Sequence, residues 1–485
     1  MCGFLGILGE KGLDVVPQVL KGLQAIQHRG QDAAGIVTFH EKFHAKKGLG
    51  LVRDVFSRKH LERLRGNLAL GHVRYPTVGA GAEGDVQPFW LDFPMGIAMA
   101  HNGNVTNFPD LRHSYFRERG IHMSSNCDLE AVLYVFASAL IRSGGNGITP
   151  ERIYAAVEEV FTRVHGAYSV VGMIPGGGLF AFRDPYGIKP IIMGERENDG
   201  HSYAVSSESV VLDVIGYGNQ RDIGPGEVLF IDLDRNIHSR RLVAKPHRPC
   251  LFELVYFARP DSFLDRVSVY KSRLRMGKAL ADKWRRTGLE ADVVIPVPES
   301  ARIAALSMGQ ELGIPYREGF VKNRYVGRTF IMPLDNQRRD SIRAKLNTIG
   351  LEFENKDVLI VDDSIVRGNT SRQLVQLARE AGARRVFIAS CSPPLRFPCP
   401  YGIDMSTRRE FIAQGREAEE VAKVIGCDAL VYQDLEDLEQ CGLQGNPELE
   451  AFCKACFDGD YPTGDMTPEV LESIDRERTS SQSER

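Results

Sequence analysis

The stretch from residue 356 to 391 constrains the fold of this chain more than any other. "KDVLIVDD" (356–363) is an apolar run that ends in two acids, "TSRQLVQLAREAGA" (370–383) has its apolar residues at helical spacing, and "RRVFIASC" (384–391) is apolar again. Apolar strands that alternate with helices are typical of a parallel sheet covered on both faces. The alternation already begins near residue 265, where a helical pattern (268–284) precedes the apolar run "ADVVIPVP" (291–298). The second half is therefore predicted to be α/β.

The first half follows a different pattern. Helical patterns over 14–28, 128–142 and 150–164 are set among many short strand-like runs, and "PGGGL" (175–179) is typical of a hairpin turn. This arrangement predicts an α+β domain with antiparallel pairing that ends near residues 235–245. A chain of 485 residues is too long for one ordinary core, so two or three domains are expected.

Composition excludes several classes of function. The formal net charge of −3 gives no electrostatic footprint for nucleic acid, and no apolar run approaches the length that spans a membrane. The N-terminus has no pattern of a signal peptide, so we expect a cytoplasmic protein. Nine cysteines, an odd number, favour free thiols, catalysis or metal binding over a disulfide framework.

A candidate phosphate site follows the apolar strand, in "VLIVDDSIVRGNTS" (358–371). Backbone N–H groups and the helix dipole converge where such a loop enters a helix, and Gly368 lets the backbone approach an anion closely. Asp362 and Asp363 could accept hydrogen bonds from ribose hydroxyls or help to hold Mg²⁺. An ordinary strand–turn–helix with solvated acids explains each residue separately, but explains the combination poorly.

This stretch resembles the signature of phosphoribosyltransferases. Together with "FVKNRYVGRTFIMP" (320–333), it resembles the amidophosphoribosyltransferase (glutamine phosphoribosylpyrophosphate amidotransferase) family, and the similarity runs from residue 2 to about 460. The resemblance implies that Ser300, Asp362 and Asp363 bind Mg²⁺. It also implies a cradle for the 5′-phosphate of phosphoribosyl pyrophosphate (PRPP), made by Arg367, Gly368, Asn369, Thr370 and Ser371. Asn369 departs from the threonine that many members carry.

The same resemblance implies that the loop at 322–331 closes over the substrate. Its cations Lys322, Arg324 and Arg328 would neutralise the diphosphate of PRPP. A merely solvated basic loop is the alternative for this stretch.

The N-terminus, "MCGFLGILGE", places Cys2 directly behind Met1. Removal of Met1 would leave a thiol nucleophile and an α-amine on one residue, whereas a small buried hydrophobe at the start of a strand is the plain alternative. Four stretches follow in the order of a class II glutamine amidotransferase domain: "QHRGQDAAGI" (27–36), "GHVRYPTVG" (71–79), "AHNGNVTN" (100–107) and "SSNCDLE" (124–130). We therefore expect simple removal of Met1 to expose the nucleophile.

Roles for residues of these stretches follow from the resemblance. Asn102 and the N–H of Gly103 would form the oxyanion hole, because donors must face the charge that develops on the amide oxygen. Arg74 would bind the carboxylate of glutamine and Asp128 its ammonium. Arg29 and Gly30 would support the site beside the nucleophile.

The remaining cysteines divide into two groups. Cys453 and Cys456 form a C-x₂-C pair that suits a metal centre, with zinc or a redox pair as competing interpretations. Cys250 and Cys399 match the positions that complete a [4Fe–4S] set in the iron–sulfur branch of the family, which implies a structural cluster. The other thiols are expected to be small buried hydrophobes: Cys127, Cys391, Cys427 and Cys441.

The fold implied by the resemblance has three parts. Residues 1–240 would form an α+β N-terminal-nucleophile (Ntn) hydrolase domain, an αββα sandwich. Residues 241–445 would form an α/β type I phosphoribosyltransferase domain with a parallel sheet. Residues 446–485 would add a C-terminal segment with two cluster cysteines and a polar tail.

The implied reaction releases ammonia from glutamine at Cys2 and passes it to C1 of PRPP. The products would be 5-phosphoribosylamine, glutamate and diphosphate, in the first step of purine synthesis. A shielded passage should connect the sites, with Tyr256 at the interface, because ammonia in water is largely protonated. The family also implies a homotetramer inhibited by purine nucleotides such as AMP and GMP. Two alternatives are a regulatory protein that binds PRPP without turnover and an iron–sulfur sensor with an inactive catalytic half.

Overall fold

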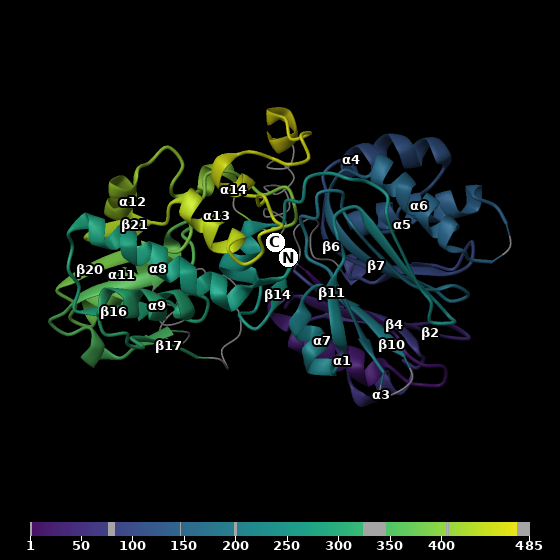
Figure 1. The fold of residues 1–485 in the computed structure, drawn as a ribbon, viewed down its shortest axis with the longest axis horizontal. Helices are drawn as coiled ribbons and strands as arrows, with labels where there is room; N and C mark the ends of the chain where they lie inside the picture. Colours follow the sequence, from purple (N-terminus) through teal and green to yellow (C-terminus); the bar gives the residue numbers. More distant parts are fainter. Residues whose placement is uncertain are drawn as a thin grey trace.

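The computed structural model describes residues 2–75, 83–145, 147–197, 201–323, 346–403, 405 and 407–472. Its two halves lie side by side, with the N-terminal half in purple to teal and the second half in green to yellow (Figure 1). Within the described ranges, no helix is both long enough and apolar enough to cross a membrane.

Two antiparallel sheets form the first half. The first has the order β11-β9-β10-β1-β4-β2-β3, and the second has the order β13-β12-β8-β7-β6-β5. The strands of the first sheet are β1 (Gly3–Leu8), β2 (Ala33–His40), β3 (Lys42–Leu49), β4 (Leu68–Arg74), β9 (Ile192–Arg196), β10 (Ser202–Ser206) and β11 (Gly218–Asp222). Those of the second are β5 (Phe89–Leu91), β6 (Ile97–Val105), β7 (Gly166–Ile174), β8 (Gly178–Arg183), β12 (Glu227–Asp232) and β13 (Ile237–Arg241).

Helices cover the outer face of each sheet. α1 (Val16–Ala25) and α7 (Ser209–Ile215) pack on the seven-stranded sheet, while α5 (Asp128–Arg142) and α6 (Pro150–Arg163) pack on the six-stranded sheet. A third core lies between the two sheets. Central strands such as β1 are buried along their whole length because they have a core on both faces. The expected αββα sandwich is confirmed (Figure 1).

The second half contains a four-stranded parallel sheet in the order β16-β19-β20-β21. Its strands are β16 (Val293–Pro296), β19 (Asp357–Asp362), β20 (Arg385–Ser390) and β21 (Ala429–Tyr432). The helices around this core are α8 (Val269–Thr287), α9 (Arg302–Leu312), α11 (Asn369–Glu380) and α12 (Ala418–Ile425). The α/β alternation read from the sequence is thus confirmed.

Shorter elements complete the described chain. The short strand pairs are β14 (Phe263–Leu264) with β15 (Val267–Ser268), and β17 (Phe320–Lys322) with β18 (Leu346–Thr348). The remaining α-helices are α2 (Val52–Val55), α3 (Arg58–Leu61), α4 (Phe108–Asp110), α13 (Leu435–Leu443) and α14 (Ala455–Asp458).

Element boundaries agree closely with expectation, with one informative difference. The helix over 128–142 matches α5, and the "PGGGL" turn joins β7 to β8. The helix expected over 14–28 ends at Ala25, and a 3₁₀ turn at Gln27–Arg29 follows it. This turn leaves the helical path and places Arg29 in the interior, where it is 2% exposed.

Candidate active site

The start of β1 places Cys2 beside three segments of the first half. Gly3 is paired with Val73 of β4, so Cys2 lies at the level of Arg74 and Tyr75. The Cys2 thiol is 3.6 Å from the carbonyl oxygen of Tyr75. The Cys2 nitrogen donates to Asn102 Oδ1 at 3.4 Å, which connects the first sheet to β6 of the second. Cys2 is only partly buried, as a nucleophile that must meet a substrate requires.

Asn102 carries an unused donor next to this thiol. Its side chain is fully buried, and within the described chain Nδ2 has no hydrogen-bond partner. A buried donor without a partner costs about 1–3 kcal/mol, so such a group is retained where a ligand oxygen accepts from it. The adjacent Gly103 has φ +150°, and a Cβ there would lie 2.0 Å from the oxygen of Ala167 on β7. Only glycine therefore fits at this position against β7.

Arg74 and Asp128 supply opposite charges in the same region. Arg74 is buried at the end of β4, 3.8 Å from Asp85 Oδ2. Asp128 begins α5, and its carboxylate accepts a 2.8 Å hydrogen bond from the N–H of Val105. Burial raises the pKa of Asp128, but nearby His101, the Val105 N–H and Arg74 together outweigh burial and hold that pKa below its ordinary value. The site therefore offers a carboxylate for an ammonium group and a guanidinium for a carboxylate.

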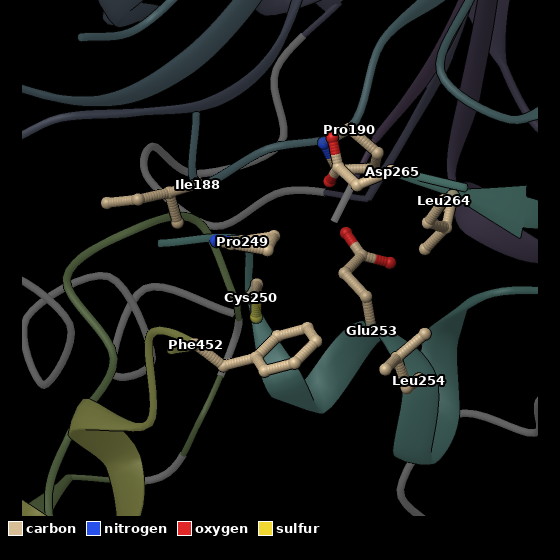
Figure 2. Close-up of a pocket in the computed structure, with 9 residues that line it drawn as sticks. All are labelled: Ile188, Pro190, Pro249, Cys250, Glu253, Leu254, Leu264, Asp265 and Phe452. Atoms are coloured by element: carbon tan, nitrogen blue, oxygen red, sulfur yellow. The ribbon is translucent and has the colours of Figure 1, made fainter. Parts of the chain in front are cut away.

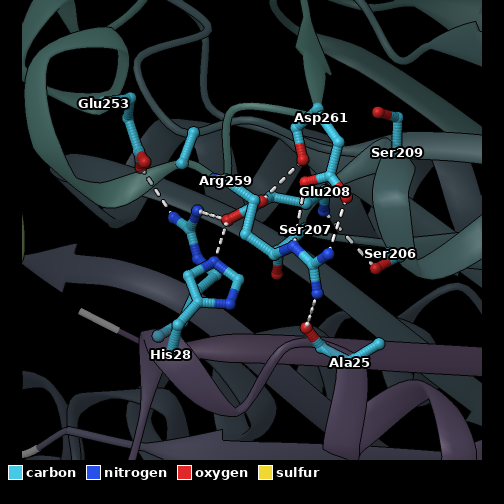
Figure 3. A network of polar contacts seen from close by, with 12 residues as sticks. Ala25, His28, Ser206, Ser207, Glu208, Ser209, Glu253, Arg259 and Asp261 are labelled. Atoms are coloured by element: carbon cyan, nitrogen blue, oxygen red, sulfur yellow. Dashed lines mark hydrogen bonds and ion pairs between the residues drawn. The ribbon is translucent and has the colours of Figure 1, made fainter. Parts of the chain in front are cut away.

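Arg29 fixes the backbone of Cys2. Figure 3 shows the polar network around it, to which His28, Glu208 and Glu253 belong. The Nε of Arg29 donates to the carbonyl oxygen of Cys2 at 3.0 Å, one terminal nitrogen donates to Glu253 at 2.7 Å, and the other pairs with Glu208. Burial raises the pKa of Glu208, yet His28 and Arg29 reverse this and leave that pKa far below its ordinary value. The side chains of Arg29, Glu208 and Glu253 in this network are buried, and that of His28 is partly exposed.

The same network joins the two halves of the chain. Glu208 Oε2 accepts from the N–H of Arg259 at 3.1 Å and from the Ser262 hydroxyl at 2.7 Å, and both donors belong to the segment that leads into α8. Glu208 and Glu253 were not among the residues expected from the sequence, because neither stands in a recognisable motif. Gly30, beside Arg29, has no room for a side chain, because a Cβ there would lie 2.5 Å from the Val73 backbone.

A small cavity of about 10 Å³ adjoins Glu253, which leaves room for about one water molecule. Figure 2 shows the carboxylates of Glu253 and Asp265 on one side of it and Cys250 and Phe452 on the other. Glu253 Oε2 has no hydrogen-bond partner among the residues described. One oxygen of Glu253 is therefore bound to Arg29, while the other has no protein donor.

The paired acids of the second half lie at the carboxyl end of β19. The hydroxyl of Ser300 donates to Asp363, the hydroxyl of Ser364 donates to Asp363 at 2.7 Å, and the Asp363 N–H donates to Asp362 at 2.9 Å. Burial, followed by repulsion from Asp363, raises the pKa of Asp362 well above its ordinary value. Burial also raises the pKa of Asp363, although Ser300, Ser364 and Arg273 oppose the rise. These oxygen donors fit Mg²⁺, which proteins commonly hold with one or two carboxylates.

The loop that follows is shaped to receive an anion. Gly368 has φ +73°, and a Cβ there would lie 2.2 Å from Ile412 Cδ1. Helix α11 begins at Asn369 with no side chain capping its first N–H groups. Asn369 and Thr370 are exposed, Ser371 is buried, and exposed Arg367 pairs with Glu410 at 3.1 Å. Lys322 is exposed at the end of β17, while Arg324 and Arg328 lie outside the described residues.

Four buried cysteines converge from three segments. Cys250 and Cys453 face each other in an isolated parallel bridge, and the N–H of Phe397 donates to the carbonyl oxygen of Cys456 at 3.2 Å. Burial raises the pKa of Cys250 to about 12 and, with the neighbouring thiols including Cys399, raises those of Cys453 and Cys456 well above the ordinary value. Across the described ranges none of the nine cysteines forms a disulfide.

These four thiols are a candidate metal centre on the basis of their burial and proximity. The described residues contain no group of three or more histidines, cysteines or acids that could hold one ion. A four-iron cluster takes four cysteine ligands spread around a larger body. The other four cysteines are buried, as expected, at Cys127, Cys391, Cys427 and Cys441.

Comparison with known proteins agrees with this geometry. A family model described as a glutamine amidotransferase domain matches residues 72–213. The amidophosphoribosyltransferase of Pseudomonas aeruginosa is 48% identical over 99% of this chain and 97% of its own length, and that of Escherichia coli is 47% identical over 98% and 95%. A solved structure of the B. subtilis glutamine PRPP amidotransferase complexed with ADP and GMP superposes with a TM-score of 0.85 at 36% identity, covering 96% of this chain and 98% of that one. This chain belongs to the amidophosphoribosyltransferase family.

Proposed function

We propose that this protein transfers the amide nitrogen of glutamine to PRPP, giving 5-phosphoribosylamine, glutamate and diphosphate in the first step of purine synthesis. The observation that carries the proposal is the hydrogen bond from the Cys2 nitrogen to Asn102 Oδ1, while the Nδ2 donor of the same buried amide has no partner among the described residues. We assign glutamine hydrolysis to residues 1–240, transfer to residues 241–445 and an anchoring role to residues 446–485. The reaction takes place in the cytoplasm, where thiols stay reduced.

In the glutaminase step, the Cys2 thiolate attacks the amide carbon of glutamine, the C–N bond breaks to release ammonia, and a glutamyl thioester forms. Water then hydrolyses the thioester to glutamate and restores the thiol. Once Met1 is removed, the nitrogen beside Asn102 is an α-amine that titrates near neutral pH and takes the thiol proton. Asn102 Nδ2 and the Gly103 N–H donate to the developing oxyanion. Arg74 and Asp128 hold the carboxylate and ammonium of glutamine, and Arg29 keeps the Cys2 peptide in place.

In the transfer step, residues 367–371 bind the 5′-phosphate through backbone N–H groups and hydroxyls at the start of α11. Asp362, Asp363 and Ser300 would hold Mg²⁺, which would supply positive charge for the diphosphate. Lys322, Arg324 and Arg328 add cations around the same group. Ammonia released at Cys2 attacks C1 of PRPP and diphosphate leaves. We assign Tyr256, which is 44% exposed, to the interface that ammonia crosses between the two halves.

We assign the protein to the iron–sulfur branch, with Cys250, Cys399, Cys453 and Cys456 as ligands of a structural [4Fe–4S] cluster. The support is the mutual proximity and burial of these four thiols. A homotetramer inhibited by purine nucleotides completes the proposal, and the B. subtilis relative was solved with ADP and GMP.

The decisive comparison is Cys2→Ala with glutamine and with ammonia as nitrogen donor. The variant should lose glutamine-dependent diphosphate release and keep ammonia-dependent release at raised pH, where more ammonia is unprotonated. A regulatory protein or an inactive sensor would turn over neither donor in its wild-type form. Retention of glutamine use by Cys2→Ala contradicts the assigned nucleophile.

A further inference from the structure

A short segment, residues 398–402, lies between the C-terminal cysteines and the strand that carries Asn102. On one side it is held by the C-terminal segment: the Tyr461 hydroxyl donates to the carbonyl oxygen of Pro398 at 2.8 Å, and the Tyr401 hydroxyl is 2.6 Å from Thr463 Oγ1. Tyr401 is 1% exposed, and Cys399 lies within the segment. The segment is thus fixed to the part of the chain that contributes Cys453 and Cys456.

On its other side the segment touches β6. Asn104 Nδ2 donates to the carbonyl oxygen of Pro400 at 2.8 Å, and both residues are buried. Gly402 has φ +90°, and a Cβ there would lie 2.6 Å from the oxygen and 2.7 Å from the carbonyl carbon of Gly103. Residue 402 therefore lies directly against the backbone of Gly103, with no space for a methyl group.

Gly103 therefore lies close to two backbone segments. A side chain on Gly103 would meet the backbone of residue 167 on β7, and a side chain on Gly402 would meet the carbonyl group of Gly103. A methyl group at residue 402 would therefore displace Gly103 or the segment 398–402. Hydrogen-bond donors stabilise an oxyanion only when they are aimed at the place where it forms, and a displacement of about 1 Å can cost about 100-fold in rate.

We propose that Gly402 is a positioning residue for the oxyanion hole. The segment that carries Cys399 thereby sets the direction in which the Gly103 N–H points. The inference rests on the proposed role of Asn102 and Gly103 in glutamine hydrolysis. It assigns a function to a contact between the two halves that lies away from the substrate. Asn104 supports the same contact through its hydrogen bond to Pro400.

The test compares Gly402→Ala with Gly464→Ala in the full-length, anaerobically purified protein. Gly464 also has a positive φ, +73°, and belongs to the C-terminal segment, but a Cβ there has nothing within 4 Å. Gly464→Ala therefore introduces the backbone strain without the clash. We expect Gly402→Ala to lower kcat for glutamine about 10- to 100-fold, with KM within about twofold and ammonia-dependent transfer unchanged, and Gly464→Ala to stay near wild type.

A second measurement distinguishes a changed direction of the Gly103 N–H from a general loss of folded structure. Iodoacetamide alkylates the Cys2 thiol without passing through a tetrahedral oxyanion, so its rate should be unchanged in Gly402→Ala. Asn104→Asp, which cannot donate to Pro400, should show a smaller loss of glutamine kcat in the same pattern. The inference is overturned if Gly402→Ala matches Gly464→Ala, or if both test variants lose glutamine and ammonia activities together. Asn102→Ala tests the proposed function separately. Full glutamine hydrolysis in that variant would contradict the assignment of Asn102 to the oxyanion hole.

Discussion

Arg29 and Glu253 form a buried ion pair at 2.7 Å, and the same guanidinium donates to the carbonyl oxygen of Cys2 at 3.0 Å. A residue of the second half is therefore two hydrogen bonds away from the peptide of the nucleophile. Glu208 completes the network by binding Arg29 together with Ser262. The charges are excluded from water, so each carboxylate is needed to compensate the buried guanidinium.

We predict that Glu208→Gln destabilises the protein by about 3 kcal/mol, because it leaves the charge of Arg29 partly uncompensated in the interior. It should also slow glutamine hydrolysis, since the Cys2 carbonyl loses a fixed donor. Urea unfolding followed by circular dichroism measures the first effect. Glu62→Gln is the control, because the Arg58–Glu62 pair is exposed and should contribute at most about 0.5 kcal/mol. Equal effects for the two variants contradict the structural role of the network.

The depressed pKa of Glu208 fixes the sign of a pH effect. A carboxylate whose pKa is lower in the folded protein adds stability above its unfolded value, near 4.5, and loses it as the pH falls toward the folded value. Between pH 5 and pH 3 the wild type should therefore lose more stability than Glu208→Gln. A set of urea midpoints across this range measures the difference, and parallel curves for the two proteins would contradict it.

The raised pKa of Asp362 leads to a pH effect on stability of the opposite sign. Its raised pKa means that the folded state disfavours the charged acid, so this site costs stability as the pH rises above the ordinary value near 3.8. Without Mg²⁺ at pH 7.5, Asp362→Asn should raise Tm, while PRPP-dependent transfer is lost. Asp282→Asn, at an exposed acid of α8, should change neither property. A lower Tm for Asp362→Asn would show that the pair is not strained by burial and repulsion.

Gly103→Ala should abolish glutamine use. A Cβ would lie 2.0 Å from a backbone oxygen of β7 at φ +150°, so the peptide must move away from its position beside Cys2. We expect a loss of 100-fold or more in glutamine-dependent kcat, with the ammonia-dependent reaction retained. Gly120→Ala is a matched control, because Gly120 also has positive φ and has open space around it. Wild-type glutamine kinetics in Gly103→Ala would contradict the assignment of Gly103 to the oxyanion hole.

The assignment of four cysteines as cluster ligands predicts that substitutions of different buried cysteines have different effects on the iron content. Cys453→Ser should lose iron and acid-labile sulfide, because it removes one of the four proposed ligands. Cys441→Ser should retain both, because Cys441 is equally buried but belongs to α13. The measurement is iron and sulfide per chain after anaerobic purification. Equal iron content in the two variants contradicts the proposed ligand set.

Much of the fold could be predicted because it follows from local patterns. The period of the apolar residues and the turn signals specified α5, the β7–β8 hairpin and the alternation around β19. The candidate phosphate loop could be proposed from the sequence because its acids, glycine and hydroxyls are contiguous. The roles of Glu208, Glu253 and Gly402 could not be read in this way. Glu208 and Glu253 act on Arg29 from 179 and 224 residues away, and Gly402 acts on Gly103 only through the packing of the two halves.

The central claim, that Cys2 is the terminal nucleophile, is tested most directly by mass spectrometry of the N-terminal peptide after rapid acid quenching of the enzyme with glutamine. The account predicts that active molecules begin at Cys2 and that the quenched peptide carries a glutamyl group on the Cys2 sulfur, which is absent without glutamine. Active molecules that retain Met1, or a glutamyl group on any other residue, would contradict it.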